Sequence, residues 1–95
     1  MEGAAFEWDT KKDAANLRKH GVGFAEARTV FGDSLSVTIS DPDNAAAEER
    51  FVIVGMSTAR KLLVVVHTMR EERIRLISAR TATRYERRVY EETYF

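Results

Sequence analysis

Apolar side chains recur at helical spacing in two segments near the start of the chain. In residues 10–20 they are sparse, and only Ala14, Leu17 and Ala15 are expected to face a core. In residues 24–31 they are dense. The apolar positions there are Phe24, Ala27, Val30 and Phe31. The spacing therefore predicts a longer helix followed by a shorter one.

Residues with known capping preferences bound the first of these helices. Asp9 precedes it and is a good N-cap, and Gly21 follows it where glycine commonly ends a helix. Residues 6–8, just before Asp9, are predicted to form a short edge strand. The chain is therefore expected to begin with a strand and two helices.

Alternating apolar and polar positions predict a strand at residues 35–40, followed by a loop. Three further strands are expected at residues 50–56, 61–69 and 73–80. Because the connections between these three strands are short, the strands must pair as an antiparallel meander. Residues 61–69 are apolar on both faces, which indicates a central strand with helices on each side.

A last helix is predicted at residues 83–92, where Thr83 as N-cap and Glu86 three positions later form a capping box. The expected fold class is α+β, with a short N-terminal strand, two helices, a four-stranded antiparallel sheet and a C-terminal helix. A chain of 95 residues has room for one hydrophobic core, so residues 1–95 are expected to form a single domain.

The composition excludes several classes of site. No apolar stretch is long enough to span a membrane, and the N-terminus lacks the pattern of a signal peptide, so a cytoplasmic protein with no membrane partner is expected. The absence of cysteine excludes disulfides and thiolate zinc sites, and we expect neither a cofactor nor a resident metal. One acidic loop offers Mg²⁺ ligands, although such loops are more often solvated. Its carboxylates are Asp41, Asp43, Glu48 and Glu49.

Charge is distributed unevenly although the chain is neutral overall, with 15 basic and 15 acidic side chains. Residues 1–59 carry 6 basic and 10 acidic groups, and residues 60–95 carry 9 and 5, so the two parts have net charges of −4 and +4. Such asymmetry is typical of a protein with a polyanion-binding face, or of one with an ordinary solvated charged surface.

Alternation along the strand at residues 73–80 separates its arginines. Arg73 and Arg75 share one face, whereas Arg80 closes the apolar row of the other face just before the last helix. A helix N-terminus has unpaired N–H groups and a positive dipole. Arg80 beside that N-terminus, with Arg84 one turn along, would therefore form a cradle for phosphate.

A purely structural explanation of Arg80 is also open. Glu86, or another carboxylate, would pair with Arg80 and tie the strand to the helix. Independently of Arg80, Tyr85 is either an ordinary core or surface aromatic side chain or a ring that stacks on an RNA base. The sequence does not decide between the cradle and the tie.

His67 is a second candidate because an imidazole titrates near neutral pH and can act as a general acid or base. It ends an apolar run, where a buried structural histidine is the commoner explanation. Its surroundings depend on the hairpin register. If Arg70 opposes Arg73, His67 shares a face with Arg80, and a shift of one residue places His67 with Arg73 instead.

Lys19 and His20 fall in the last turn of the first helix, where the helix dipole favours cations. That is a sufficient structural reason for both side chains. The functional alternative is a cationic corner that contacts RNA phosphate.

Four motifs in this order resemble the BrnT family: FEWD at residues 6–9, KHGV at 19–22, LLVVVHT at 62–68 and RxISAR at 75–80. The resemblance extends from about residue 5 to residue 92. One position departs from it. Gly23 stands where a Ser- or Asp-like cap is expected, which affects helix stability more than activity.

The resemblance implies a RelE-like ribonuclease toxin of a bacterial type II toxin–antitoxin pair, which halts translation. Its implied partner is a BrnA-type antitoxin, bound in a hetero-oligomer, and contact with operator DNA would come only through that antitoxin. By position, the family pattern falls on Trp8, Lys19, His20, His67, Arg73, Arg75, Arg80 and Glu86.

The mechanism that fits these residues is metal-independent attack of an RNA 2′-OH on the adjacent phosphate. We predict catalytic roles for Arg80, His67, Glu86 and Lys19. Predicted phosphate or RNA contacts are Arg73, Arg75, Arg84, His20 and Tyr85. Two other functions stay open, namely a non-catalytic module that binds nucleic acid or a protein partner, and a gyrase-type inhibitor on the same fold.

Overall fold

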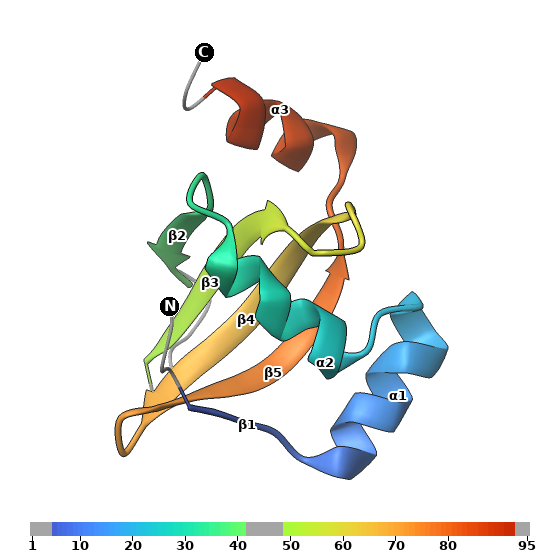
Figure 1. The fold of residues 1–95 in the computed structure, drawn as a ribbon, viewed down its shortest axis with the longest axis vertical. Helices are drawn as coiled ribbons and strands as arrows, with labels where there is room; N and C mark the ends of the chain where they lie inside the picture. The colour runs from blue at the N-terminus through green and yellow to red at the C-terminus, as the bar shows by residue number, and fades with distance from the viewer. Residues whose placement is uncertain (1–4, 42–48, 93–95) are drawn as a thin grey trace.

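The computed structural model describes residues 5–41 and 49–92. Within these residues the elements follow the order β1 (Phe6–Glu7), α1 (Thr10–His20), α2 (Phe24–Ala27), the 3-10 helix η1 (Arg28–Gly32), β2 (Val37–Ser40), β3 (Arg50–Met56), β4 (Leu62–Arg70), β5 (Arg73–Thr81) and α3 (Arg84–Glu92). Figure 1 shows one sheet with α2 and η1 across one of its faces, α1 at its side and α3 beyond one end.

The sheet has five strands in the order β1-β5-β4-β3-β2. The predicted antiparallel meander from β2 to β5 is confirmed. The prediction of a four-stranded antiparallel sheet is wrong, because β1 joins the edge of β5 in parallel and makes the sheet five-stranded and mixed. No tight turn connects β1 to β5, so chain geometry does not force an antiparallel direction.

The main core lies between the sheet and the α2–η1 segment. The predicted second helix forms as one α-helical turn followed by the 3-10 turn, and all four of its predicted core residues are buried: Phe24, Ala27, Val30 and Phe31. This segment lies very close to β3. A Cβ on Gly55 would be only 2.8 Å from Cγ1 of Val30, so glycine permits the close approach.

Helix α1 has the predicted ends but not the predicted core face. Asp9 caps its N-terminus, and Gly21 ends it with a φ of 73°. Ala14 and Ala15 are exposed and Leu17 is 54% exposed, so the prediction that these three side chains face a core is wrong. The helix lies beside the edge of β5, and its one buried residue is polar.

That buried residue is Asn16, whose side chain replaces a missing strand neighbour. Its Nδ2 donates to the carbonyl of Ala79 at 2.7 Å, and its Oδ1 accepts from the N–H of Ala79 at 3.1 Å. Nδ2 also donates to the carbonyl of Val22 at 2.8 Å. Because β1 pairs with β5 only at Ile74 and Arg75, this amide satisfies β5 backbone groups that β1 does not reach.

A β-bulge interrupts the pairing of β4 with β5. Val66 opposes Ser78 and His67 opposes Leu76, so Ile77 is an extra residue on β5. The bulge reverses which face the later side chains occupy. Ala79 therefore joins Leu76 in the core that α2 and η1 cover. The prediction that Arg80 closes the Leu76 row is wrong, since Arg80 lies on the opposite face.

The opposite face of the sheet is covered less completely. The capping box predicted at the start of α3 is confirmed, because the Glu86 N–H donates to Oγ1 of Thr83 at 3.1 Å and the Thr83 N–H donates to Oε1 of Glu86 at 2.8 Å. No residue of α3 is buried, and the helix contacts the sheet mainly at β3. The expected helical cover on both faces of β4 is thus only partly present.

Candidate functional site

Two segments meet at one end of the sheet: the turn between β3 and β4, and the link from β5 to α3. The N–H of Ala82 donates to the carbonyl of Leu62 at 2.9 Å, which holds the two segments together. Their cationic side chains are Arg60, Lys61, Arg80 and Arg84, and we call this group the basic corner. Three of the four are exposed and Arg80 is half-buried, so the basic corner presents positive charge to solvent.

Arg80 and Glu86 form a bidentate ion pair. Nη1 and Nη2 of Arg80 each donate to one oxygen of Glu86 at 2.7 Å, and Nη1 also donates to the carbonyl of Thr81 at 3.3 Å. The structural explanation of Arg80, as a tie between strand and helix, is thus confirmed. Among the described residues, Nε–H and the second N–H of Nη2 have no partner. That edge of the guanidinium, on a side chain that is 41% exposed, can still meet a phosphate.

Glu86 is held in its ionised form. The hydrogen bonds from Arg80, with a smaller contribution from the Thr83 backbone, outweigh burial and lower the pKa of Glu86 to about 2. The same contact raises the pKa of Arg80. Glu86 therefore carries no proton to donate at neutral pH and is a weak base, and its clear effect is to orient Arg80.

Acidification is expected to remove a stabilising contribution of Glu86. Its pKa is depressed from 4.5 in the unfolded chain to about 2 in the fold, so this contribution is complete above the unfolded value and is lost as pH falls through the folded value. For so exposed an ion pair we expect about 1 kcal/mol. Urea unfolding of the protein and of Glu86→Gln should differ at neutral pH and converge in acid. A difference that does not change with pH would contradict this assignment.

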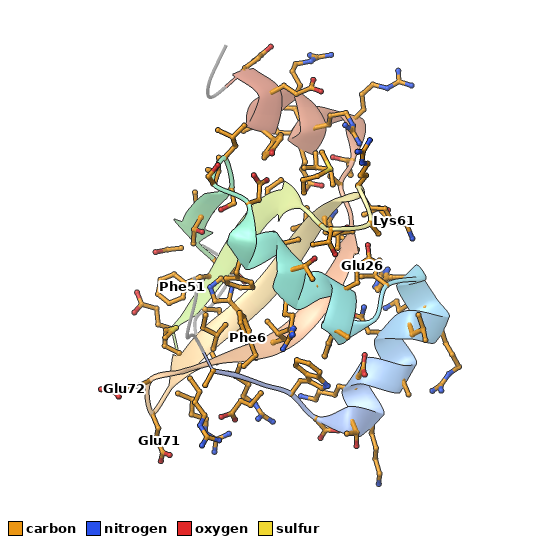
Figure 2. The ribbon with its side chains drawn as sticks, viewed as in Figure 1. Phe6, Glu26, Phe51, Lys61, Glu71 and Glu72 are labelled. Atoms are coloured by element: carbon orange, nitrogen blue, oxygen red, sulfur yellow. The ribbon has the colours of Figure 1, made fainter. Side chains whose placement is uncertain are left out.

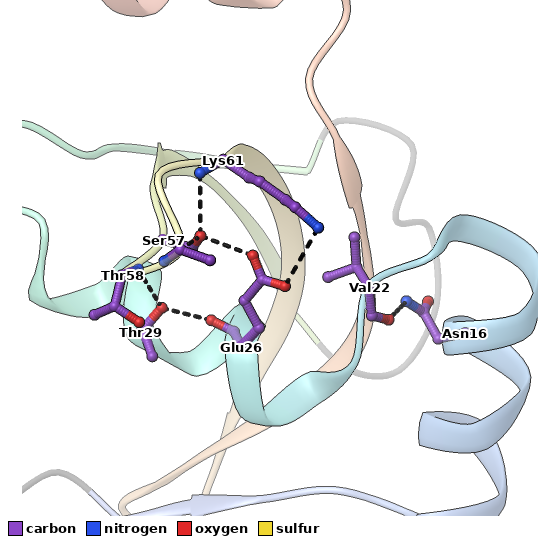
Figure 3. A network of polar contacts seen from close by, with 8 residues as sticks. Asn16, Val22, Glu26, Thr29, Ser57, Thr58 and Lys61 are labelled. Atoms are coloured by element: carbon purple, nitrogen blue, oxygen red, sulfur yellow. Dashed lines mark hydrogen bonds and ion pairs between the residues drawn. The ribbon is translucent and has the colours of Figure 1, made fainter.

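A second polar network lies on the α2 side of the basic corner (Figure 3). Oγ of Ser57 donates to Oε2 of Glu26 at 2.8 Å, and Nζ of Lys61 lies 4.0 Å from Oε1 of Glu26. Oγ1 of Thr29 donates to the Glu26 carbonyl at 2.6 Å and accepts from the Thr58 N–H at 3.0 Å. This network fixes the turn between β3 and β4, which carries Arg60 and Lys61.

Sequence reasoning missed Lys61, Arg60 and Glu26. The antiparallel pairing of β4 with β5 could have revealed the first two. In such a pair the start of β4 lies beside the end of β5, so Arg60 and Lys61, just before β4, must lie near the residues that follow β5. Figure 2 shows Lys61 and Glu26 close together at this end of the sheet, and Glu71 and Glu72 at the tip of the opposite end.

His67 is buried away from the basic corner. It is 5% exposed, with the ring of Phe31 at 4.8 Å and the stacked ring of Phe51 at 5.7 Å. Burial lowers the pKa of His67 and outweighs the opposing effect of the Val65 backbone, so the imidazole is neutral at pH 7.

The hairpin register is the first of the two alternatives, with Arg70 opposite Arg73. The inference that this register would place His67 on the face of Arg80 is wrong, because the bulge at Ile77 lies between them. No sequence feature marked that bulge.

The remaining predicted residues separate into two groups. Arg84, Tyr85 and Glu86 lie together in the first turn of α3 beside Arg80. Arg73 is exposed where β5 leaves the hairpin, at the far end of the sheet from Arg80.

Arg75 and the cations of α1 have other surroundings. Arg75 pairs with Glu7 of β1, with Nη1 and Oε2 2.8 Å apart. Lys19 and His20 are exposed in the last turn of α1, and Trp8 packs edge-on against Phe24 with ring centroids 6.2 Å apart.

Only part of the candidate acidic loop lies within the described residues. Asp43 and Glu48 lie outside the described residues, so a Mg²⁺ site there stays a prediction. Within residues 5–41 and 49–92, no three His, Asp or Glu side chains gather as metal ligands. In the same part of the chain, no helix is both long and apolar enough to cross a bilayer.

Comparison with known proteins assigns the fold. The solved structures include a similar one, the 1.1 Å crystal structure of the Brucella abortus ribonuclease toxin BrnT, with a TM-score of 0.63 and 21% sequence identity over 85% of this chain and 99% of that one. The two share the α+β architecture. The RelE-like description does not match in detail, because this sheet is mixed and five-stranded.

The sequence itself gives the family. No curated protein has a significant match to this sequence. Residues 8–86, however, match the family described as the ribonuclease toxin BrnT of type II toxin–antitoxin systems. This match covers most of the chain and includes the segments that form the basic corner. The chain therefore belongs to the BrnT family of toxins from type II toxin–antitoxin systems.

Proposed function

We propose that the protein is a ribonuclease that cleaves RNA at the basic corner and thereby inhibits translation and growth. The observation that carries the proposal is that four cations lie on two chain segments which a backbone hydrogen bond holds side by side at one end of the sheet. A clustered set of exposed cations is what binding to an RNA backbone requires. The family description, a ribonuclease toxin, supports the same activity.

The reaction we propose is transesterification within the RNA. The 2′-oxygen forms a bond to phosphorus while the bond from phosphorus to the 5′-oxygen breaks, which leaves a 2′,3′-cyclic phosphate and a free 5′-OH. One proton passes from the 2′-OH to water, and one passes from water to the leaving oxygen. Negative charge grows on the phosphoryl oxygens, so cations held in place there lower the barrier.

Arg80 has the main role in this proposal. Its end-on pairing with Glu86 fixes the guanidinium and leaves the Nε and Nη2 edge for two phosphoryl oxygens. Glu86 is then a positioning residue rather than a proton carrier. Lys61 and Arg84 would hold phosphates on either side.

Other predicted residues enter with smaller roles or none. Lys19 and His20 stay predicted contacts to flanking phosphates, and Tyr85 stays a predicted stacking surface. We assign no proton transfer to His67, because its ring is enclosed by aromatic side chains.

The test is incubation of the purified protein with total RNA. Fragments that end in 2′,3′-cyclic phosphate are expected, and the reaction should proceed in EDTA. Intact RNA that is merely shifted on a gel would refute cleavage and leave a binding module. Activity that returns only with added Mg²⁺ would refute the metal-independent route and implicate the acidic loop.

A further inference from the structure

Helix α3 is attached to the sheet by polar contacts rather than by a buried apolar face. Glu86 holds one end through Arg80, and at the other end the hydroxyl of Tyr90 donates to Oδ2 of Asp33 at 2.6 Å. On the same helix Tyr85, just before Glu86, is 71% exposed, and Val89, just before Tyr90, is 43% exposed. The helix thus leaves apolar surface open that a packed helix would bury.

Beneath that open surface lies a groove between α3 and the strands β2 and β3. Its apolar walls are Val37, Ile39, Val52 and Val54 of the sheet and Tyr85 and Val89 of the helix, and we call it the α3 groove. Its cavity volume is about 300 Å³. A volume of this size lies at the low end of the range for binding pockets and accepts a few apolar side chains.

The strand beside the groove is an edge strand. β2 is last in the sheet order, and within the described residues its outer edge has no strand partner. Ile39 is 57% exposed and shares its face with Val37. An extended segment paired with this edge would direct every second side chain over the α3 groove.

Charge indicates the chemistry of the segment that would fit. Arg84, Arg87 and Arg88 occupy the first half of α3, and Glu91 and Glu92 the second, so the arginines add to the positive end of the helix dipole. Arg87 lies 3.9 Å from Glu91, whereas Arg84 and Arg88 have no ion pair among the described residues. Glu86 also lines the groove, but its carboxylate is paired with Arg80, so an acidic segment is complementary to the arginines that flank the groove at this end of α3.

We propose that the α3 groove is the docking site of the antitoxin, which adds an extended segment along β2. Apolar side chains of that segment would fill the groove, and acidic side chains would face Arg84 and Arg88. Membership of a type II family implies an antitoxin partner. The expectation that docking inhibits RNA cleavage rests on the proposed function. The docked segment would cover Arg84, which belongs to the basic corner.

The test measures the affinity of the purified toxin for its cognate antitoxin, by titration calorimetry. Ile39→Ser with Val89→Ser should weaken binding about 100-fold, because two exposed apolar contacts are lost. Arg88→Glu should weaken binding about tenfold and reduce its salt dependence. Leu17→Ser is the matched control, since Leu17 is 54% exposed on α1, and it should bind like the unchanged protein.

Two further measurements separate the loss of antitoxin binding from a loss of ribonuclease activity or of folding. RNA cleavage by the free Ile39→Ser, Val89→Ser variant should be unchanged, so a failure of docking is distinguishable from a failure of the proposed ribonuclease. Hydrogen exchange of β2 amides should slow when the antitoxin binds. Unaltered affinity of the double variant would overturn the proposal. So would a toxin dimer that this variant abolishes, because the groove would then hold a second copy.

Discussion

Arg80→Ala is expected to lower the rate of RNA cleavage about 10²–10³-fold, the range found when one donor to a developing oxyanion is removed. In the cell the variant should no longer inhibit growth. The reason is that Arg80 is the one cation of the basic corner whose guanidinium is fixed, by two 2.7 Å hydrogen bonds to Glu86. Single-turnover cleavage of RNA, with growth curves after induction, measures both effects.

Loss of Arg80 also removes one attachment of α3, so controls must separate chemistry from folding. Glu86→Gln retains a side chain that completes a capping box but weakens the ion pair, and cleavage should fall about tenfold because Arg80 keeps its charge and loses its orientation. Arg87→Ala removes a cation from the same helix and should leave the rate unchanged. Circular dichroism should show all three folded. If Arg80→Ala remains toxic and active, the basic corner is not the active site.

The predictions that held rest on local signals. Asp9, Gly21 and the pair of Thr83 and Glu86 act within one helical turn, so their roles follow from neighbouring residues alone. The meander is equally local, because short connections allow one pairing. The pairing of Arg80 with Glu86 was one of the two explanations that the sequence left open, and it joins residues only six positions apart.

Two local irregularities are not visible in residue propensities. The register of the β4–β5 hairpin stayed open because Glu71 and Glu72 adopt φ values of 51° and 67° in the turn, although neither is the Gly or Asn that usually marks such a turn. Ile77 is an ordinary strand residue, yet it bulges and moves Arg80 to the other face. This single extra residue on β5 is enough to place Arg80 and His67 on opposite faces of the sheet.

Asn16 was missed for a different reason. A periodicity search treats apolar residues as core residues, and an asparagine in a helix is expected at the surface. Its burial follows from a tertiary fact, namely that β1 is too short to cover the edge of β5. The sequence of α1 alone holds no sign of this.

Asn16→Ala is expected to destabilise the protein by about 3 kcal/mol, because three buried hydrogen bonds are lost and backbone groups of Ala79 are left without partners. A domain of this size has a free energy of unfolding of roughly 5–14 kcal/mol, so the change is a large fraction of the total. The melting temperature should fall by roughly 12–24 °C. Differential scanning calorimetry and urea unfolding measure the two quantities.

Asn16→Asp isolates the donors, because it preserves the shape and the acceptor for the Ala79 N–H but turns both Nδ2 hydrogen bonds into contacts between oxygens. The introduced carboxyl should favour its protonated form in the fold, so this variant loses stability as pH rises and recovers part of it in acid. Leu17→Ala, one residue away and largely exposed, should change the stability by less than about 0.5 kcal/mol. If Asn16→Ala is no more destabilising than Leu17→Ala, the Asn16 side chain does not take the place of a neighbouring strand at the edge of β5.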